Sequence, residues 1–120
     1  MKLSNSKTIK SLVFIVSNLS VSIVLASTPL DCYNYARENT INKPTAIALC
    51  KGAPNEMAPA DCYNQMRWAS FNRLSSEDRV KLCSGSEDAE LTIDCFTKAR
   101  SSYTRGFLSV DEAIELCSKN

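Results

Sequence analysis

Apolar positions recur at helical spacing along the part of the chain that follows residue 30. Each of three cysteines is followed by apolar side chains at the first and fourth places, which lie on one face of a helix. These pairs are Tyr33 and Ala36, Tyr63 and Met66, and Phe96 and Ala99. A second stripe of the same kind ends at the next cysteine, most clearly between Val110 and Cys117. The pattern predicts an all-α fold of about six short helices.

The helical pattern belongs to a unit that is present three times. The sequence Asp31-Cys32-Tyr33-Asn34 recurs as Asp61-Cys62-Tyr63-Asn64 and, more loosely, as Asp94-Cys95-Phe96-Thr97. The two cysteines of a unit stand 18, 21 and 22 residues apart, whereas both gaps between units are 12. Length changes therefore fall in a loop inside the unit. We expect three tandem αα-hairpin repeats, spanning about residues 31–53, 61–86 and 94–118, in a single small domain of residues 27–120.

Cap residues predict where the helices begin. Three acids stand just before the first stripe and are predicted to be the N-caps of the first helices. They are Asp31, Asp61 and Asp94. Three further cap residues stand eight places before each closing cysteine, and the last of them forms a capping box with Glu112. They are Asn42, Ser75 and Ser109. Glycines two places past Cys50 and Cys83 predict helix stops.

The first 26 residues follow a different pattern. Met1 to Lys10 carries three lysines and no acid, and Ser11 to Ala26 is mostly apolar with short side chains at its end. This order is typical of a secretory signal peptide. We predict cleavage before Ser27, a secreted or periplasmic location, and contact with a membrane only through residues 1–26. An uncleaved signal anchor is the alternative, although a membrane span needs ~20 apolar residues.

All six cysteines follow the predicted signal peptide, and an even number in a short exported chain predicts three disulfides. In an antiparallel hairpin the two cysteines of a unit lie side by side, at its open end. We therefore expect the pairs Cys32–Cys50, Cys62–Cys83 and Cys95–Cys117. Pairing across the linkers stays open, because a simple bundle brings all six cysteines to one end. The alternative pairs are Cys50–Cys62, Cys83–Cys95 and Cys32–Cys117.

The composition offers little catalytic chemistry. The chain has no His, so it lacks the commonest general base and the commonest metal ligand. No two cysteines stand closer than 12 residues, which favours structural disulfides over a thiol catalyst or a zinc site. We expect no enzyme activity, no cofactor and no metal. Adjacent acids at 77–78, 87–88 and 111–112 leave a carboxylate-dependent hydrolase as the least favoured alternative.

One polar position recurs in all three units. An Arg follows each opening cysteine by five places, at Arg37, Arg67 and Arg100. Stacked units would align these guanidiniums in a row that binds an anionic partner. The alternative is that each one covers an aromatic ring or pairs with an acid of its own hairpin. Trp68 and Phe71 occur in the second unit only; we expect both in the core, and an exposed Trp68 would instead anchor a partner.

These observations favour a non-catalytic exported repeat protein, a protein-binding module that acts outside the cytoplasm. The formal net charge of +1 gives no indication of nucleic-acid binding. In its six cysteines and small helical form the chain resembles saposin-like proteins, which implies a lipid- or membrane-interacting role as the main alternative. It lacks their Cys-x-x-Cys near the start and their nested pairing scheme. It also has no basic amphipathic helix, which disfavours that role.

Overall fold

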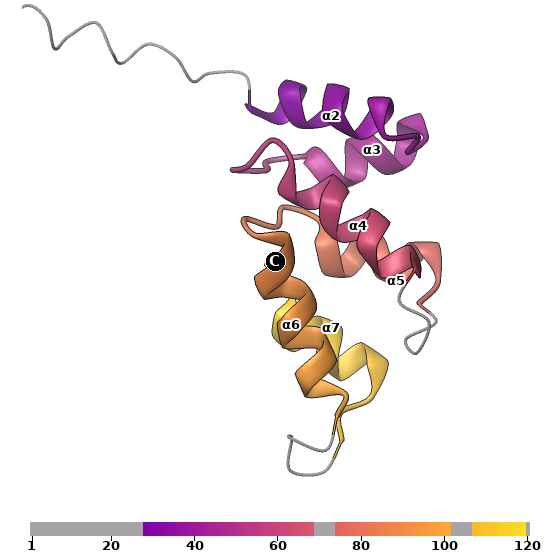
Figure 1. Cartoon of the computed structure of the whole chain (residues 1–120), viewed down its shortest axis with the longest axis vertical. Helices are drawn as coiled ribbons and strands as arrows, with labels where there is room; N and C mark the ends of the chain where they lie inside the picture. The colour runs from indigo at the N-terminus through magenta and orange to yellow at the C-terminus, as the bar shows by residue number, and fades with distance from the viewer. Residues whose placement is uncertain (1–27, 69–73, 102–106, 120) are drawn as a thin grey trace, which may run out of the picture.

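The computed structural model describes residues 28–68, 74–101 and 107–119. Within these ranges the chain forms helices and no strand, which confirms the predicted all-α class. The predicted signal peptide, residues 1–26, lies outside the described residues. The helices are α2 (Thr28–Glu38), α3 (Lys43–Cys50), α4 (Ala58–Trp68), α5 (Ser76–Cys83), α6 (Ala89–Ala99) and α7 (Val110–Cys117) (Figure 1).

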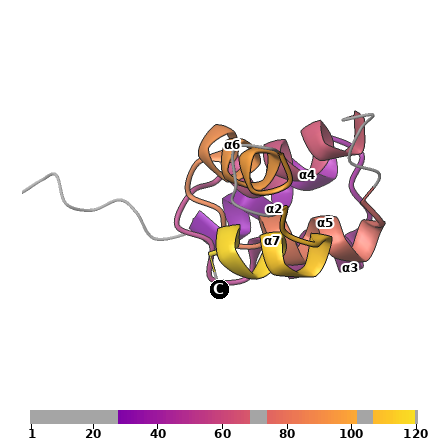
Figure 2. The same ribbon diagram turned by 90° about the horizontal axis from the view of Figure 1, so that it is seen from below.

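The helices form three antiparallel hairpins, α2–α3, α4–α5 and α6–α7, which stack in chain order (Figure 1). Seen from the end of the stack, α2, α4 and α6 make one layer and α3, α5 and α7 make the other (Figure 2). Each hairpin corresponds to one repeat of the sequence. The arrangement is a short helical solenoid, in which contacts between units of the described chain join adjacent units only.

A disulfide closes the open end of each hairpin. The bonds are Cys32–Cys50, Cys62–Cys83 and Cys95–Cys117, with Cα atoms 5.6, 5.6 and 5.7 Å apart. The predicted pairing within each unit is confirmed, and the linker pairs do not form. Closing a loop of this size stabilises a small domain by about 3 kcal/mol, mainly by restricting the unfolded chain. Helices of 8 to 11 residues need such support, because they are marginal alone.

The second helix of each hairpin starts at the predicted cap. The side chains of Asn42, Ser75 and Ser109 each accept a hydrogen bond from the backbone N–H three residues on. Ser109 also donates its own N–H to Glu112 Oε1 at 2.9 Å, which completes the predicted capping box. These side chains satisfy amides that have no partner inside the helix.

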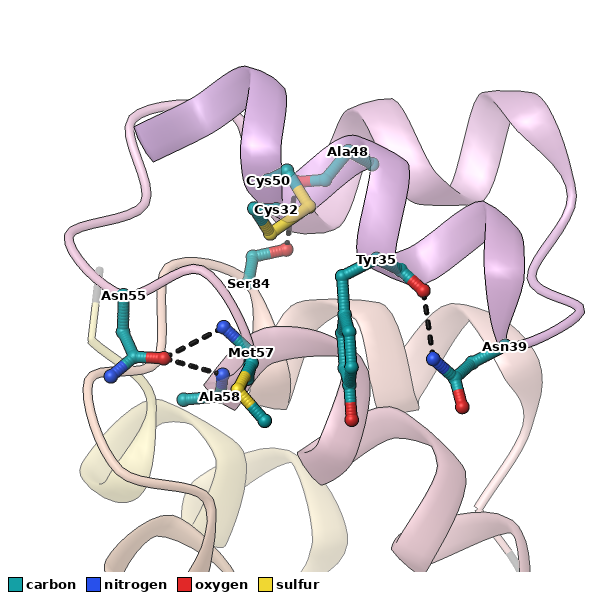
Figure 3. The surroundings of a disulfide bond; sticks show 9 residues. All are labelled: Cys32, Tyr35, Asn39, Ala48, Cys50, Asn55, Met57, Ala58 and Ser84. Atoms are coloured by element: carbon teal, nitrogen blue, oxygen red, sulfur yellow. Dashed lines mark hydrogen bonds between the residues drawn. A yellow bond between two sulfur atoms is a disulfide. The ribbon is translucent and has the colours of Figure 1, made fainter. Parts of the chain in front are cut away.

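The predicted N-caps of the first helices are wrong. Asp31 and Asp61 lie in the first turns of α2 and α4, which begin three residues earlier, and Asp94 lies inside α6. Other cap side chains stand upstream. The Asp88 carboxylate accepts a backbone N–H in the first turn of α6. The Asn55 oxygen accepts the N–H groups of residues 57 and 58 at the start of α4 (Figure 3). These earlier caps satisfy the free amides, so the helices begin before the acids.

Burial at two repeat positions shows how the units stack. The leucine before the closing cysteine is fully buried in the first two units, as Leu49 and Leu82, but Leu116 of the third unit is 66% exposed. Two places earlier the order is reversed, since Ile47 of the first unit is 54% exposed and Ile114 of the third only 7%. Each unit therefore covers the leucine of the unit before it.

Two hydrogen bonds to backbone carbonyls of α3 join the second unit to the first. The Ser84 hydroxyl donates to the carbonyl of Ala48 at 3.1 Å (Figure 3), and the Gly85 N–H donates to the carbonyl of Leu49 at 3.1 Å. Gly85 has a φ of +69°, a conformation that glycine adopts without strain. The predicted helix stop at Gly85 is confirmed, since α5 ends at Cys83. The turn that follows α5 also supplies the two donors, Ser84 and Gly85, that bind carbonyls at the end of α3.

Candidate functional site

The repeated arginines of the two outer units hold the closed ends of their own hairpins. Arg37 Nη1 donates to the carbonyl of Ile41 at 3.2 Å, and Arg100 Nη1 donates to the carbonyl of Leu108 at 3.0 Å. Each carbonyl belongs to the residue just before the N-cap of the second helix. The guanidinium thus links the end of the first helix to the start of the second. Neither side chain pairs with an acid in these contacts.

The middle unit makes the same link with a different arginine. The equivalent carbonyl is that of Leu74, and it accepts a hydrogen bond from Arg79 Nη1 at 3.1 Å. Arg79 comes from α5, four places before the closing cysteine, where the outer units have the fully buried Ala46 and Ala113. The Arg79 guanidinium thus binds the loop carbonyl from α5, and Arg67 does not make this contact.

Arg67 instead lies beside two aromatic rings. Its guanidinium carbon is 5.8 Å from the centre of the Tyr63 ring and 5.9 Å from that of Trp68. Both distances fall within the range of cation–π attraction. Arg67 is exposed and Trp68 is 75% exposed. A large indole and a guanidinium therefore stand together on the surface at the end of α4.

The Tyr63 ring lies beneath the Arg67 guanidinium. The ring is almost fully buried, with the Arg79 guanidinium 4.6 Å from its centre. The Tyr63 hydroxyl lies 3.2 Å from both Ser76 Oγ and Arg79 Nη2. Burial of the hydroxyl raises its pKa, but the hydrogen bonds from Ser76 and Arg79 and the charges of Arg79 and Arg67 outweigh burial and lower the pKa of Tyr63.

The expected burial of Trp68 is wrong. Tyr63 and Met66 are buried as the helical stripe predicts, but Trp68 stands two places past Met66 and so faces the opposite side of α4. Phe71, which we expected beside it, lies outside the described residues. The sequence does distinguish the middle unit from the other two. It has an arginine at position 79, where the other two units have a small buried alanine.

The three repeated arginines share a position but not an environment. Arg37 and Arg100 have acceptors in their own loops, whereas Arg67 has aromatic neighbours. Arg67 therefore agrees with the expectation that the arginine covers an aromatic ring, whereas Arg37 and Arg100 bind backbone carbonyls rather than the expected ring or acid. Binding of an anionic partner by all three together stays a prediction.

Acidic side chains gather around a second surface, between the middle and third units. A cavity of about 310 Å³ is lined by four carboxylates among its residues, those of Asp61, Glu87, Asp88 and Glu90. Asp61 accepts a hydrogen bond from Tyr35, Glu87 pairs with Lys119, and Asp88 caps α6. These contacts give Asp61, Glu87 and Asp88 structural roles. The part of the chain that the structure describes holds no group of three or more acids or cysteines arranged to bind a metal.

No protein family, curated protein or solved structure matches this chain. Among the helices of residues 28–68, 74–101 and 107–119, none is long and apolar enough to cross a membrane. Inferences about function therefore rest on the geometry of the chain itself.

Proposed function

We propose that the protein is a non-catalytic binding module outside the cytoplasm, and that Arg67 and Trp68 contact a protein partner. One observation carries this proposal. The middle unit alone transfers the loop contact to Arg79, and the arginine that it releases stands beside an exposed tryptophan. Tryptophan and arginine are the residues most often found at the energetic centre of protein interfaces.

The three disulfides support a role in an oxidising compartment. Disulfides persist in secreted and periplasmic proteins and are rare where thiols are kept reduced. All the described cysteines are paired, and none is free. This agrees with the export that residues 1–26 predict.

The chemistry of the two side chains indicates the kind of surface that fits them. The indole is flat and apolar with one N–H donor, and the guanidinium binds carboxylates through two parallel hydrogen bonds. The partner should therefore offer an apolar pocket next to an acidic side chain. Tyr63 and Arg79 contact each other beside Arg67, and they form an ordered base for the site.

The test is capture of the partner by the exported, disulfide-intact protein from the envelope or medium of its source, followed by titration with the purified partner. We expect Trp68→Ala and Arg67→Gln each to weaken binding at least tenfold, about 1.4 kcal/mol. Matched controls are Arg37→Gln, at the same repeat position, and Phe107→Ala, which removes another exposed ring. Both controls should bind as the original protein does.

Two outcomes would contradict this assignment. Equal losses of affinity in Arg37→Gln, Arg67→Gln and Arg100→Gln would support the row of three arginines in place of the Arg67–Trp68 surface. Unchanged affinity in Trp68→Ala and Arg67→Gln would exclude that surface as the binding site.

A further inference from the structure

Large apolar side chains are exposed at both ends of the stack. Leu30 and Ile47 of the first unit are 59% and 54% exposed, and Leu91 and Leu116 of the third unit are 69% and 66% exposed. They make up four of the seven large apolar side chains that are exposed among the described residues. Their counterparts inside the stack are covered by a neighbouring unit. Both ends thus leave an apolar repeat surface without its neighbour.

The first of these surfaces, the N-terminal end face, is a shallow hollow. It has a volume of about 280 Å³ and is lined mainly by Pro29, Leu30, Tyr33 and Ile47. The equivalent residues of the middle unit, which lies inside the stack, are buried or half-buried. They are Pro59, Ala60, Tyr63 and Val80. The N-terminal end face is therefore a copy of a surface that, one unit later, receives the preceding unit.

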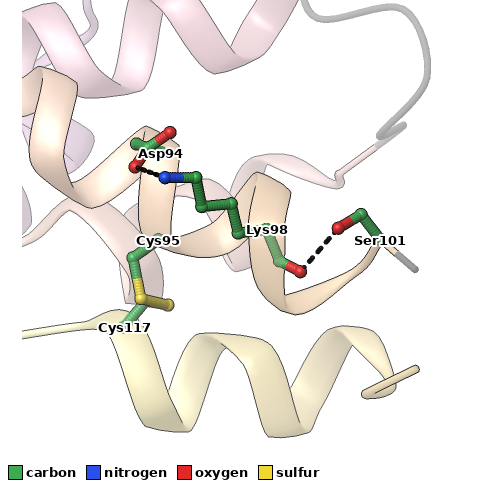
Figure 4. Close-up of polar contacts among 5 residues, drawn as sticks. All are labelled: Asp94, Cys95, Lys98, Ser101 and Cys117. Carbon is green, nitrogen blue, oxygen red and sulfur yellow. Dashed lines mark hydrogen bonds and ion pairs between the residues drawn. A yellow bond between two sulfur atoms is a disulfide. The ribbon is translucent and has the colours of Figure 1, made fainter. Parts of the chain in front are cut away.

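The second surface, the C-terminal end face, consists of Leu91 and Leu116 on either side of the last disulfide. Leu91 stands four places before Cys95, where the middle unit has the buried Ala58. Cys95 and Cys117, which join α6 to α7 (Figure 4), are half-buried, whereas both disulfides of the first two units are fully buried. This face is the surface that, in the first two units, is covered by the following unit.

We propose that the C-terminal end face of one molecule stacks on the N-terminal end face of a second copy of the chain. Solenoids that remain single normally carry polar outer faces on their terminal repeats, whereas both end faces of the described residues carry large exposed apolar side chains. The occupant is a second copy because both faces belong to one interface, already present twice inside the chain. Such a contact joins two different surfaces, so it continues from molecule to molecule.

Polar groups fit the same register. Inside the chain, the Tyr35 hydroxyl of the first unit donates to Asp61 Oδ1 of the second at 2.7 Å. Between molecules, Lys98 takes the place of Tyr35 and Asp31 takes the place of Asp61, so opposite charges meet. Lys98 is exposed and lies 3.0 Å from Asp94 of its own helix, an ion pair at the surface that can rearrange at little cost (Figure 4).

The turn after the first disulfide is also shaped for this contact. Gly52 has a φ of +67°, almost the same as the +69° of Gly85. The Gly85 N–H donates across the unit boundary to the carbonyl of Leu49. By the same register, the Gly52 N–H would donate to the carbonyl of Leu116 in the second molecule.

The test is sedimentation equilibrium of the exported protein, with its disulfides intact, over a wide range of concentration. We expect its average mass to rise with concentration beyond that of a dimer. Ile47→Lys and Leu116→Lys each put a charge on one end face, at positions exposed enough to leave the fold unchanged by circular dichroism. Each variant alone should self-associate at least tenfold more weakly.

Mixing the two variants gives the decisive measurement. Each retains one intact end face, so an equimolar mixture should form a one-to-one dimer and nothing larger. Phe107→Lys, an equally exposed ring away from the end faces, should associate as the original protein does. A protein that stays monomeric at every concentration would overturn the proposal, and so would single variants that associate normally.

A membrane surface is the competing occupant of the end faces, and it is tested with phosphatidylcholine vesicles. A monomeric protein that co-sediments with vesicles, and loses this in Ile47→Lys, would replace self-assembly with lipid binding. The outcome is independent of the Arg67–Trp68 surface, because that surface lies away from both end faces.

Discussion

Arg37, Arg67 and Arg100 occupy one repeat position, yet a residue elsewhere in the hairpin decides what each one does. Where the second helix has alanine four places before its closing cysteine, the repeated arginine binds the loop carbonyl. Where it has Arg79, that side chain binds the carbonyl and Arg67 turns to the aromatic rings. The repeated arginine is visible in the sequence. Which arginine binds the loop carbonyl is seen only in the structure, because it depends on contacts inside each hairpin.

Replacing the arginines one at a time should separate these roles. Arg100→Gln removes a charged hydrogen bond to the Leu108 carbonyl and should lower the free energy of unfolding by about 1–2 kcal/mol. Arg67→Gln removes no such bond and should change it by less than about 0.5 kcal/mol. Thermal unfolding followed by circular dichroism measures both values. Equal losses in the two variants would show that the loop contact does not matter.

Two tyrosines should titrate on opposite sides of the ordinary pKa of 10.0. The hydrogen bond from Tyr35 to the Asp61 carboxylate, with burial and the Asp61 charge, raises the pKa of Tyr35. The surroundings of Tyr63 lower its pKa. Tyr35 therefore contributes stability that is present below pH 10 and lost as the pH rises through its pKa in the folded protein. Tyr63 contributes stability that is present above pH 10 and lost as the pH falls through its lowered pKa.

Ultraviolet absorbance of the tyrosinate ion checks this assignment. The step below pH 10 should disappear in Tyr63→Phe, and a step above pH 10 should disappear in Tyr35→Phe. If Tyr63→Phe leaves the first step in place, the contacts of Tyr63 with Ser76 and Arg79 do not control its ionisation.

Among the elements, the second helix of each hairpin begins at the cap residue that the sequence predicts, whereas the first helix begins earlier than predicted. Asn42, Ser75 and Ser109 each stand eight residues before the closing cysteine of their unit, and each one caps its helix. Asp31, Asp61 and Asp94 satisfy the same chemical rule, but helical residues precede all three. A cap rule identifies residues able to start a helix, and the choice among them depends on tertiary packing. Burial of Pro59 and Ala60 against the first unit extends α4 upstream of Asp61.

A pair of substitutions in the third unit tests the corrected caps. Ser109→Ala removes the capping box of α7 and should cost about 1 kcal/mol of stability. Asp94→Ala removes only an exposed ion pair within α6 and should cost less than about 0.5 kcal/mol. Chemical denaturation gives both values. A loss in Asp94→Ala as large as that in Ser109→Ala would restore this acid as the true cap.

For the whole molecule, the stacking of units decides which disulfide is accessible. The first two bonds are enclosed by neighbouring units, and their cysteines are 0–2% exposed. Cys95 and Cys117 are half-buried, because no described unit covers this side of the third hairpin. The sequence predicted all three bonds but gave no order among them, since the pattern around each is the same and only the position in the stack differs.

Brief treatment with a reductant under native conditions should therefore open Cys95–Cys117 first. Alkylation of the new thiols and peptide mass spectrometry would identify them. The experiment is best done on dilute protein, because stacking of molecules would cover this bond. Earlier labelling of Cys32 and Cys50 would contradict the order of exposure.

The opening cysteine of each unit is bonded to the next cysteine along the chain, and this order has a consequence for biogenesis. An exported chain crosses its membrane from the N-terminus, so both cysteines of a hairpin emerge before any cysteine of the following hairpin. The oxidase that meets the chain can join thiols in order of appearance and always make the native bond. No non-native bond has to be broken afterwards, and the slow reshuffling that delays many disulfide-rich proteins is avoided. On the proposed export route, the repeat would let oxidation keep pace with translocation, one hairpin at a time.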